Sequence, residues 1–196
     1  MNGMILTPKP GPSKAKKTTT WLACATLVVG AAEGCLTYAY KDPLGIPTIC
    51  YGETKGVQMG DKATQEECDT KLAKSLIEFD ADMQRRIGKE KVEALPPQTR
   101  AMFVSLYYNV GPGGKGVKDG FFTLKSGNPS TISTKIRAGD LYGACMEFPK
   151  WDNPKWLRGI AIRRDKEMGI CLEGLSPSKV SYSDALRVPG AFSWLT

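Results

Sequence analysis

Apolar residues recur at intervals of three or four along the stretch that follows Thr64, a spacing typical of one buried helix face. The repeating positions are Cys68, Leu72, Leu76, Phe79, Met83 and Ile87. Thr64 and Glu67 have the spacing of a capping box, and Gly88 is a suitable end for a helix. The pattern therefore predicts one long helix between Thr64 and Gly88.

The second half of the chain shows shorter helical patterns separated by glycine and proline. Pro96-Pro97 favours the start of a helix that continues to Val110, where Gly111-Pro112-Gly113-Gly114 ends it. Further helical patterns occupy roughly residues 130–138, 140–148 and 158–172. The second half is therefore expected to be mostly helical.

The first part of the chain divides into three stretches of different character. Residues 1–17, with three prolines and four lysines, are typical of a disordered basic arm. Residues 18–32 form an uncharged run that predicts a helix with Glu33 near its C-terminal end. From residue 36 to 60, turn residues separate short β-prone runs, which predicts an antiparallel hairpin or a three-stranded sheet. The main domain would span residues 33–173, and residues 174–196, rich in Ser, Pro and Gly, would extend beyond it.

The chain length, the net charge and the histidine and cysteine content narrow the class of protein. A chain of 196 residues is enough for one compact domain or two small lobes that share a core. The formal net charge of +7 favours an anionic partner such as nucleic acid, anionic lipid or the acidic bacterial wall. No RNA-recognition or zinc-finger pattern occurs, which argues against nucleic acid. The chain has no His and no C-x-x-C pair among its six cysteines, so a zinc site is not expected.

Two carboxylates lie around the boundary between the expected helix and the expected hairpin. Glu33 would lie at a helix C-terminus, where the dipole disfavours an anion and shielding from water would help the side chain keep a proton. Asp42 begins an Asp-Pro turn. Two carboxylates in unlike environments are what cleavage of a glycosidic bond requires. Taken singly, Glu33 is more often a solvated helix end and Asp42 a turn former, so the prediction depends on their joint spacing.

That spacing carries a resemblance. Asp42 lies nine positions after Glu33, Thr48 lies six positions after Asp42, and Ile-x-Tyr-Gly follows. This order resembles the phage-type lysozymes of glycoside hydrolase family 24, whose catalytic triad is Glu, Asp and Thr. The resemblance thus assigns catalytic roles to Glu33, Asp42 and Thr48. Many members continue Gly-His, whereas this chain has Gly52-Glu53, which puts in doubt any pairing role for that histidine.

The resemblance covers roughly residues 33–172. Tyr108 and Asn109 lie in a Tyr-Tyr-Asn-Val-Gly segment similar to the family's Tyr-Asn-Val-Gly, which makes them candidate substrate-binding residues. Arg163-Arg164 and Glu167 resemble the C-terminal end of these enzymes, and ion pairs within one lobe are the favoured role of the arginines. The resemblance implies a mainly α-helical α+β fold. A small β-containing N-terminal lobe, a long connecting helix and a helical C-terminal lobe would enclose a cleft.

The function implied is that of an endolysin, a muramidase that hydrolyses the β-1,4 bond between N-acetylmuramic acid and N-acetylglucosamine of peptidoglycan. Glu33 would be the general acid, while Asp42 and Thr48 activate a water in an inverting arrangement. A monomer without metal or organic cofactor is expected. The alternatives are a lytic transglycosylase, which would use Glu33 alone, and a non-catalytic wall-binding phage protein. The complete set of three residues argues against both.

The cysteines are expected to form two cross-links. Cys50 ends the expected strand and Cys68 lies in the first turns of the long helix, whereas Cys145 and Cys171 lie on two helices of the other lobe. Family members often carry cysteines at these places, and an even, well-separated set favours disulfides in an oxidising compartment. We therefore expect Cys50–Cys68 and Cys145–Cys171 bonds, although single cysteines also occur as small buried apolar residues.

Residues 18–32 suggest how the enzyme reaches the wall. Lysines precede the run, and positive charge before an apolar segment favours a cytoplasmic N-terminus with the enzyme outside. The run is short of the ~20 strongly apolar residues of a stable span, so its stay in the membrane would be transient. This resembles the signal-anchor-release endolysins and predicts the host periplasm or the periplasmic side of the inner membrane. The alternative is the first helix of a cytoplasmic enzyme that depends on a holin. A Cys24–Cys35 bond would need a broken helix, since 11 helical residues span ~16 Å.

Overall fold

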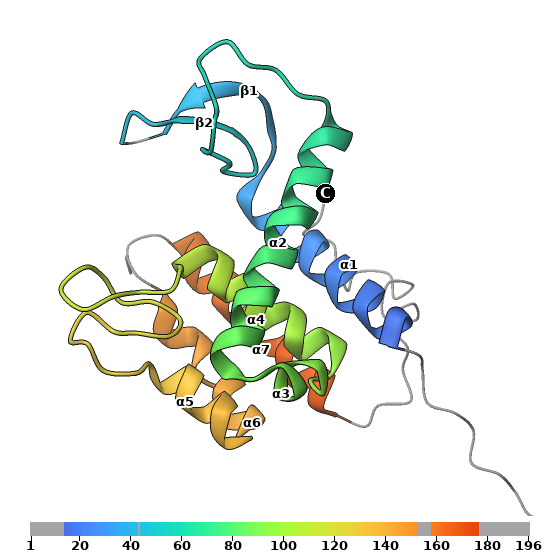
Figure 1. The fold of residues 1–196 in the computed structure, drawn as a ribbon, viewed down its shortest axis with the longest axis vertical. Helices are drawn as coiled ribbons and strands as arrows, with labels where there is room; N and C mark the ends of the chain where they lie inside the picture. Colours follow the sequence, from blue (N-terminus) through green and yellow to red (C-terminus); the bar gives the residue numbers. More distant parts are fainter. Residues whose placement is uncertain (1–13, 43, 153–157, 177–196) are drawn as a thin grey trace, which may run out of the picture.

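The computed structural model describes residues 14–42, 44–152 and 158–176, and the structural statements below concern these residues. They form an upper lobe with a two-stranded hairpin and a lower lobe of helices, joined by the long helix α2 (Gln65–Ile87) (Figure 1). This is the mainly α-helical, lysozyme-like α+β arrangement that the sequence predicted, and that prediction is confirmed.

The hairpin pairs β1 (Leu36–Lys41) with β2 (Pro47–Cys50) in antiparallel register, with Tyr40 opposite Thr48. It is the simpler of the two sheets expected. At the end of β2, Cys50 has a φ of 58°, a left-handed conformation that is uncommon for a residue with a Cβ. A disulfide joins Cys50 to Cys68 of α2, so the hairpin is fixed to the long helix.

Helix α2 follows the predicted pattern closely. The Thr64 hydroxyl accepts from the Glu67 backbone N–H, and the Glu67 carboxylate accepts from the Thr64 backbone N–H, which completes the capping box. The predicted apolar face is buried except at Phe79, which is half-buried and packs edge-on against two tyrosines of the next long helix. Gly88, with a φ of 117°, ends the helix. The five-residue helix α3 (Lys89–Glu93) was not predicted, because it is too short to show a period.

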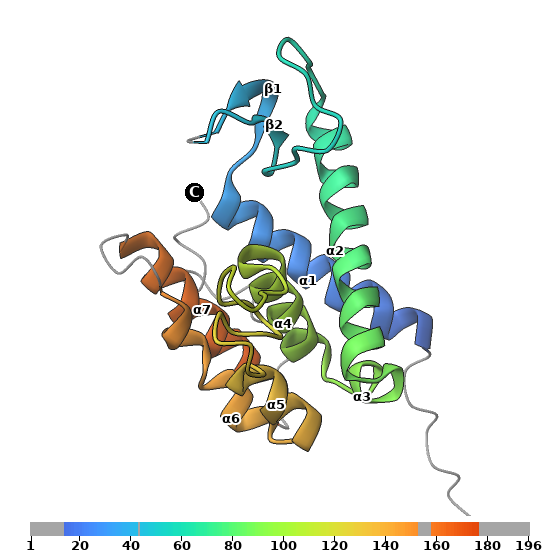
Figure 2. The same ribbon diagram turned by 60° about the vertical axis from the view of Figure 1, so that its left-hand side comes forward.

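The lower lobe is built around α4 (Pro97–Val110), against which α1 (Lys14–Glu33), α2 and α7 (Arg158–Leu175) pack (Figure 2). Every residue from Thr99 to Tyr107 is buried, as expected for a helix surrounded by others. The remaining helices are α5 (Thr131–Ala138), α6 (Leu141–Cys145) and the 3₁₀ helix η1 (Phe148–Trp151). A second disulfide, Cys145–Cys171, joins α6 to α7.

Helix α1 includes the weakly apolar run. Trp21, Cys24, Ala25 and Val29 are buried in the core of the lower lobe, and burial, aided by Glu173, raises the pKa of the Cys24 thiol to about 12. Cys24 is a free thiol here, as is Cys35. Among the helices in the described ranges, none combines the length and the apolar character that crossing a membrane would need.

The element bounds differ from the expected segment bounds at both ends. Helix α1 begins at Lys14, so residues 14–17 of the expected arm are helical, and α7 continues to Leu175, two residues past the expected end of the domain. Residues 1–13 of the arm and 177–196 of the extension lie outside the described residues.

A buried ion pair that the sequence did not predict joins three helices of the lower lobe. Asp80 on α2 accepts two hydrogen bonds from the Arg100 guanidinium on α4, at 2.7 and 2.6 Å. The same guanidinium lies 4.8 Å from the ring centre of Trp21 on α1. Cation and aromatic face attract each other at this distance, so the pair also helps to seat α1.

Candidate active site

Glu33 is the last residue of α1, as the sequence predicted. Gly34 follows with a φ of 69°, and this left-handed conformation, which glycine adopts without steric cost, turns the chain into β1. The Glu33 side chain is 26% exposed. The carboxylate therefore lies between the two lobes and is accessible to a ligand.

Two side chains from other helices contact one oxygen of Glu33. Arg163 on α7 donates from Nη1 at 2.6 Å, and Asn109 at the end of α4 donates from Nδ2 at 3.4 Å. Burial alone would lower the pKa of Arg163, but the carboxylates of Glu167 and Glu33 outweigh it and raise that pKa. Arg163 and Arg164 also pair with Glu167 on α7, in line with the ion pairs expected within the lobe, whereas the ion pair of Arg163 with Glu33 was not predicted.

Asn109 lies where two cavities meet. A cavity of about 680 Å³ is lined by Asn109, Lys118, Lys125 and Trp151, among others, and a second of about 480 Å³ is lined by Glu33, Asn109, Arg163 and apolar residues of α1 and α7. The position suits the substrate-binding role predicted for Asn109, which stays a prediction. Glu33 lines the second cavity, and Asn109 lines both, so the two cavities together offer room for a long, polar ligand.

Tyr108, the other predicted substrate-binding residue, lines neither of these cavities. Its hydroxyl donates to the Tyr51 carbonyl at 3.2 Å, and its ring packs against Phe79. Burial, with smaller contributions from the Glu33 and Glu53 carboxylates, raises the pKa of Tyr108 to about 12. Tyr108 thus has a supporting role, because it connects α4 to the end of the hairpin and to α2.

The loop after α4 shapes one wall of the larger cavity. Gly113 and Gly120 approach so closely that a Cβ on Gly113 would lie 1.9 Å from the Thr123 carbonyl oxygen. Only glycine fits there, which explains the glycine-rich run that the sequence analysis noted at the end of this helix.

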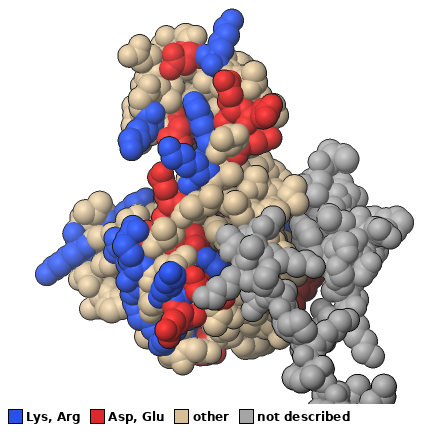
Figure 3. Space-filling view, turned by 45° about the vertical axis from the view of Figure 1, so that its right-hand side comes forward, with Lys and Arg blue, Asp and Glu red and all other residues tan. Residues whose placement is uncertain are grey.

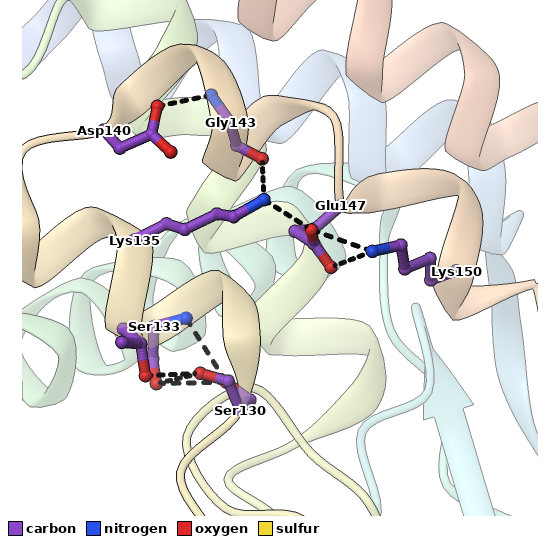
Figure 4. Close-up of polar contacts among 8 residues, drawn as sticks. Ser130, Ser133, Lys135, Asp140, Gly143, Glu147 and Lys150 are labelled. Atoms are coloured by element: carbon purple, nitrogen blue, oxygen red, sulfur yellow. Dashed lines mark hydrogen bonds and ion pairs between the residues drawn. The ribbon is translucent and has the colours of Figure 1, made fainter.

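Ion pairs hold the helices on the other side of the larger cavity together (Figure 4). Glu147 accepts from Lys135 at 2.7 Å and from Lys150 at 2.9 Å. Burial alone would raise the pKa of Glu147, but the two lysines outweigh it and lower that pKa. Asp140 caps α6 by accepting from the Gly143 N–H at 2.9 Å. The contacts join α5, α6 and η1 into one rigid wall.

The structure places Asp42 and Thr48 on the hairpin. Asp42 Oδ1 accepts from the backbone N–H groups of Leu44 and Ile46 at 2.9 and 2.8 Å, so this residue does form the turn. Thr48 is 3% exposed, and its hydroxyl donates to the Ile46 carbonyl at 3.0 Å. In the part of the chain that the structure describes, neither residue forms a hydrogen bond with Glu33.

Glu53 stands where the family often has histidine. Its backbone pairs with Ile49, and its carboxylate accepts from the Ser75 hydroxyl of α2 at 3.3 Å. The position therefore still connects the hairpin to the long helix, with a neutral donor as its partner.

Basic and acidic side chains are interspersed on the face shown in Figure 3, on the upper as well as the lower lobe. On this face, neither the basic nor the acidic side chains are confined to one lobe.

Comparisons with known proteins identify the class. The phage lysozyme family matches residues 30–167, and the chain belongs to this family. It is 35% identical to the SAR-endolysin of Bacteriophage PS119, over 72% of this chain and 77% of that protein. It is equally similar to the SAR-endolysin of Enterobacteria phage P21, over 72% and 78%. The fold is similar to the active form of P1 phage endolysin Lyz, with a TM-score of 0.65 and 22% identity over 87% of this chain and 99% of that one.

Proposed function

We propose that this chain is a phage endolysin that hydrolyses the β-1,4 bond between N-acetylmuramic acid and N-acetylglucosamine in peptidoglycan. The observation that carries the proposal is the position of Glu33 at the end of α1, where it lines a cavity and contacts Asn109. Membership of the phage lysozyme family supports the same reaction.

In the proposed mechanism, which follows glycoside hydrolase family 24, Glu33 protonates the oxygen of the leaving sugar. Asp42 and Thr48 hold and activate a water on the opposite face of the sugar, which inverts the anomeric centre. The backbone bonds to Asp42 Oδ1 fix the orientation of this carboxylate in the turn.

Digestion of purified cell walls by the full chain tests the reaction. Hydrolysis releases new reducing ends, whereas a lytic transglycosylase releases anhydro-sugars and a wall-binding protein releases neither. Glu33→Gln should abolish the release, while Glu78→Gln, the same change at an exposed position of α2, should not. Anhydro-sugar products, or a Glu33→Gln variant as active as the wild type, would refute the proposal.

We also propose that residues 18–32 export the enzyme to the periplasm as a transient membrane anchor. The similarity to SAR-endolysins and the weakly apolar run support this. Fractionation of cells that express the chain without a holin provides the test. Protein in the membrane and periplasm is expected, and protein confined to the cytoplasm would favour holin-dependent release instead.

A further inference from the structure

A second carboxylate lies behind Arg163, on the side away from the proposed proton donor. Glu167 on α7 is fully buried. Its Oε1 accepts from the Ser105 hydroxyl at 2.6 Å and from Arg163 Nε at 3.1 Å, and its Oε2 lies 3.0 Å from Arg164 Nε. Charged side chains are almost never fully buried unless they are paired, and the proposed mechanism makes no use of this one.

A row of alternating charge is formed by four side chains, in the order Glu33, Arg163, Glu167 and Arg164. Arg163 uses Nη1 for Glu33 and Nε for Glu167, so both carboxylates share one guanidinium. Arg164 at the end of the row is fully buried, and burial together with Arg163 lowers its pKa to about 10 against the opposing effect of Glu167. Arg164 therefore still carries its charge at neutral pH.

The row bears directly on proton donation. A general acid must hold its proton at the pH of the reaction, yet an opposite charge within hydrogen-bonding distance lowers a carboxyl pKa by roughly 1–3 units. Arg163 brings such a charge to the Glu33 carboxylate. The negative charge of Glu167 opposes this effect, and the positive charge of Arg164 reinforces it.

We propose that Glu167 is a positioning residue of the active site: it holds the Arg163 guanidinium in place, and its negative charge offsets part of the positive charge that Arg163 presents to Glu33, which helps Glu33 to act as a proton donor. This rests on the proposed function, in which Glu33 is the general acid. Ser105 on α4 fixes the orientation of Glu167 through its hydroxyl, and the row therefore ties the acid to the packing of α4 against α7.

Other titratable groups face Glu33 and remain constant in the test. Lys166 on α7 lines the same cavity. Tyr108 on α4 interacts electrostatically with Glu33 and with Glu53, which follows β2. Substitutions at positions 164 and 167 leave these groups in place. A shift in the pH dependence assigned to Glu33 would therefore come from the altered charges of the row.

The experiment compares the pH dependence of wall hydrolysis at low substrate concentration, where the alkaline limb reports the pKa of the acid in the free enzyme. Glu167→Gln keeps the shape and an oxygen for Ser105 but removes the charge, so the limb should move to lower pH by about one unit. Arg164→Met removes a positive charge and should move the limb to higher pH. Opposite shifts are not expected from a loss of packing alone.

Asp80→Asn is the matched control, because it also removes a buried carboxylate bonded to an arginine, but one that does not contact Glu33. It should destabilise the protein without moving the limb. A lower rate with an unmoved limb for both Glu167→Gln and Arg164→Met would overturn the proposal and leave Glu167 a purely structural role. If Glu167→Gln does not fold, the shift of Arg164→Met alone decides.

A carbon-13 NMR titration of the Glu33 carboxyl in the same variants separates this inference from the proposed function. The resonance, assigned through Glu33→Gln, should titrate lower in Glu167→Gln and higher in Arg164→Met, whether or not the chain cleaves walls. Unchanged titration in a wild type that hydrolyses walls would refute the positioning role alone. A wild type without hydrolysis would refute the proposed function alone.

Discussion

The two sides of the candidate site are held in different ways. On the helical side, the bonds to Glu33 connect residues 76 and 130 positions apart, from α4 and α7. On the hairpin side, the bonds of Asp42 and Thr48 reach only two or four positions along the chain. The charge environment of the proposed acid thus depends on how three helices pack, whereas the turn that carries the proposed water-activating pair depends on local sequence.

The difference has a practical meaning for mutational work. A change far from Glu33 in sequence can alter the charges around it, because the row of charges runs into the core of the lower lobe. A change at Asp42 or Thr48 should act mainly on the geometry of the turn itself, since the side-chain bonds of these two residues are local.

The largest effect is expected at the acid. Glu33→Gln conserves shape but removes the proton, so the rate of wall hydrolysis should fall by about 10²–10⁴-fold. Circular dichroism should show an unchanged fold, since Gln can still accept from Arg163. A rate within a few-fold of the wild type would show that the chemistry lies elsewhere.

Asp42→Asn should give the next largest loss. The amide oxygen of Asn can accept the same bonds from Leu44 and Ile46, so the turn should persist while the charge is lost. We expect the rate to fall by roughly 10²-fold, near the lower end for acid–base groups. If Asp42 and Thr48 act on the same water, adding Thr48→Ala to Asp42→Asn should lower the rate only slightly further. Unchanged turnover in Asp42→Asn would show that the Asp42 carboxylate takes no part in the reaction and that the hairpin side only supports the fold.

Removal of each disulfide allows the two regions to be compared by their contribution to the free energy of unfolding. Loss of Cys50–Cys68 or of Cys145–Cys171 through double serine variants should each lower the free energy of unfolding by about 2–4 kcal/mol. Because the bonded residues are 18 and 26 positions apart, the two losses should be of similar size. Urea unfolding measures both, and a loss confined to one variant would contradict the expectation. Only the Cys50–Cys68 variant should also disturb the hairpin and hence turnover.

The smallest effect is expected at the start of α2, which supports the hairpin lobe. Thr64→Ala removes the capping hydroxyl and should destabilise the protein by about 1 kcal/mol. Thr64→Ser retains the cap and serves as the control. Since the cap does not contact the helical side, the pH profile of hydrolysis should be the same in both variants, and a shifted profile would show that the two sides are coupled.

Local signals in the sequence predicted much of this architecture. The capping box at Thr64 and the apolar stripe predicted α2, because both depend on residues within one helix. The two prolines predicted the start of α4 for the same reason. The disulfide pairing followed from which elements carry the cysteines together with the family resemblance, and the structure contains the same two bonds.

Contacts between distant elements could not be predicted in this way. Nothing near Asp80 indicates Arg100 as its partner, since the bond depends on how α4 packs against α2. The ion pair of Arg163 with Glu33 was not predicted, because it depends on how α1 and α7 both pack against α4. No local sequence pattern indicates that the buried Glu167 shares Arg163 with Glu33.

The sequence by itself determined the order of the elements, the family, and the candidate residues Glu33, Asp42 and Thr48, since these depend on local pattern and on spacing along the chain. Only the tertiary structure decided that Arg163 and Asn109 contact Glu33, that Tyr108 supports the hairpin, and that Glu167 lies behind the arginine. The physical reason is that electrostatic interactions depend on distance in space and on burial. Both are set by the packing of α1 and α7 against α4.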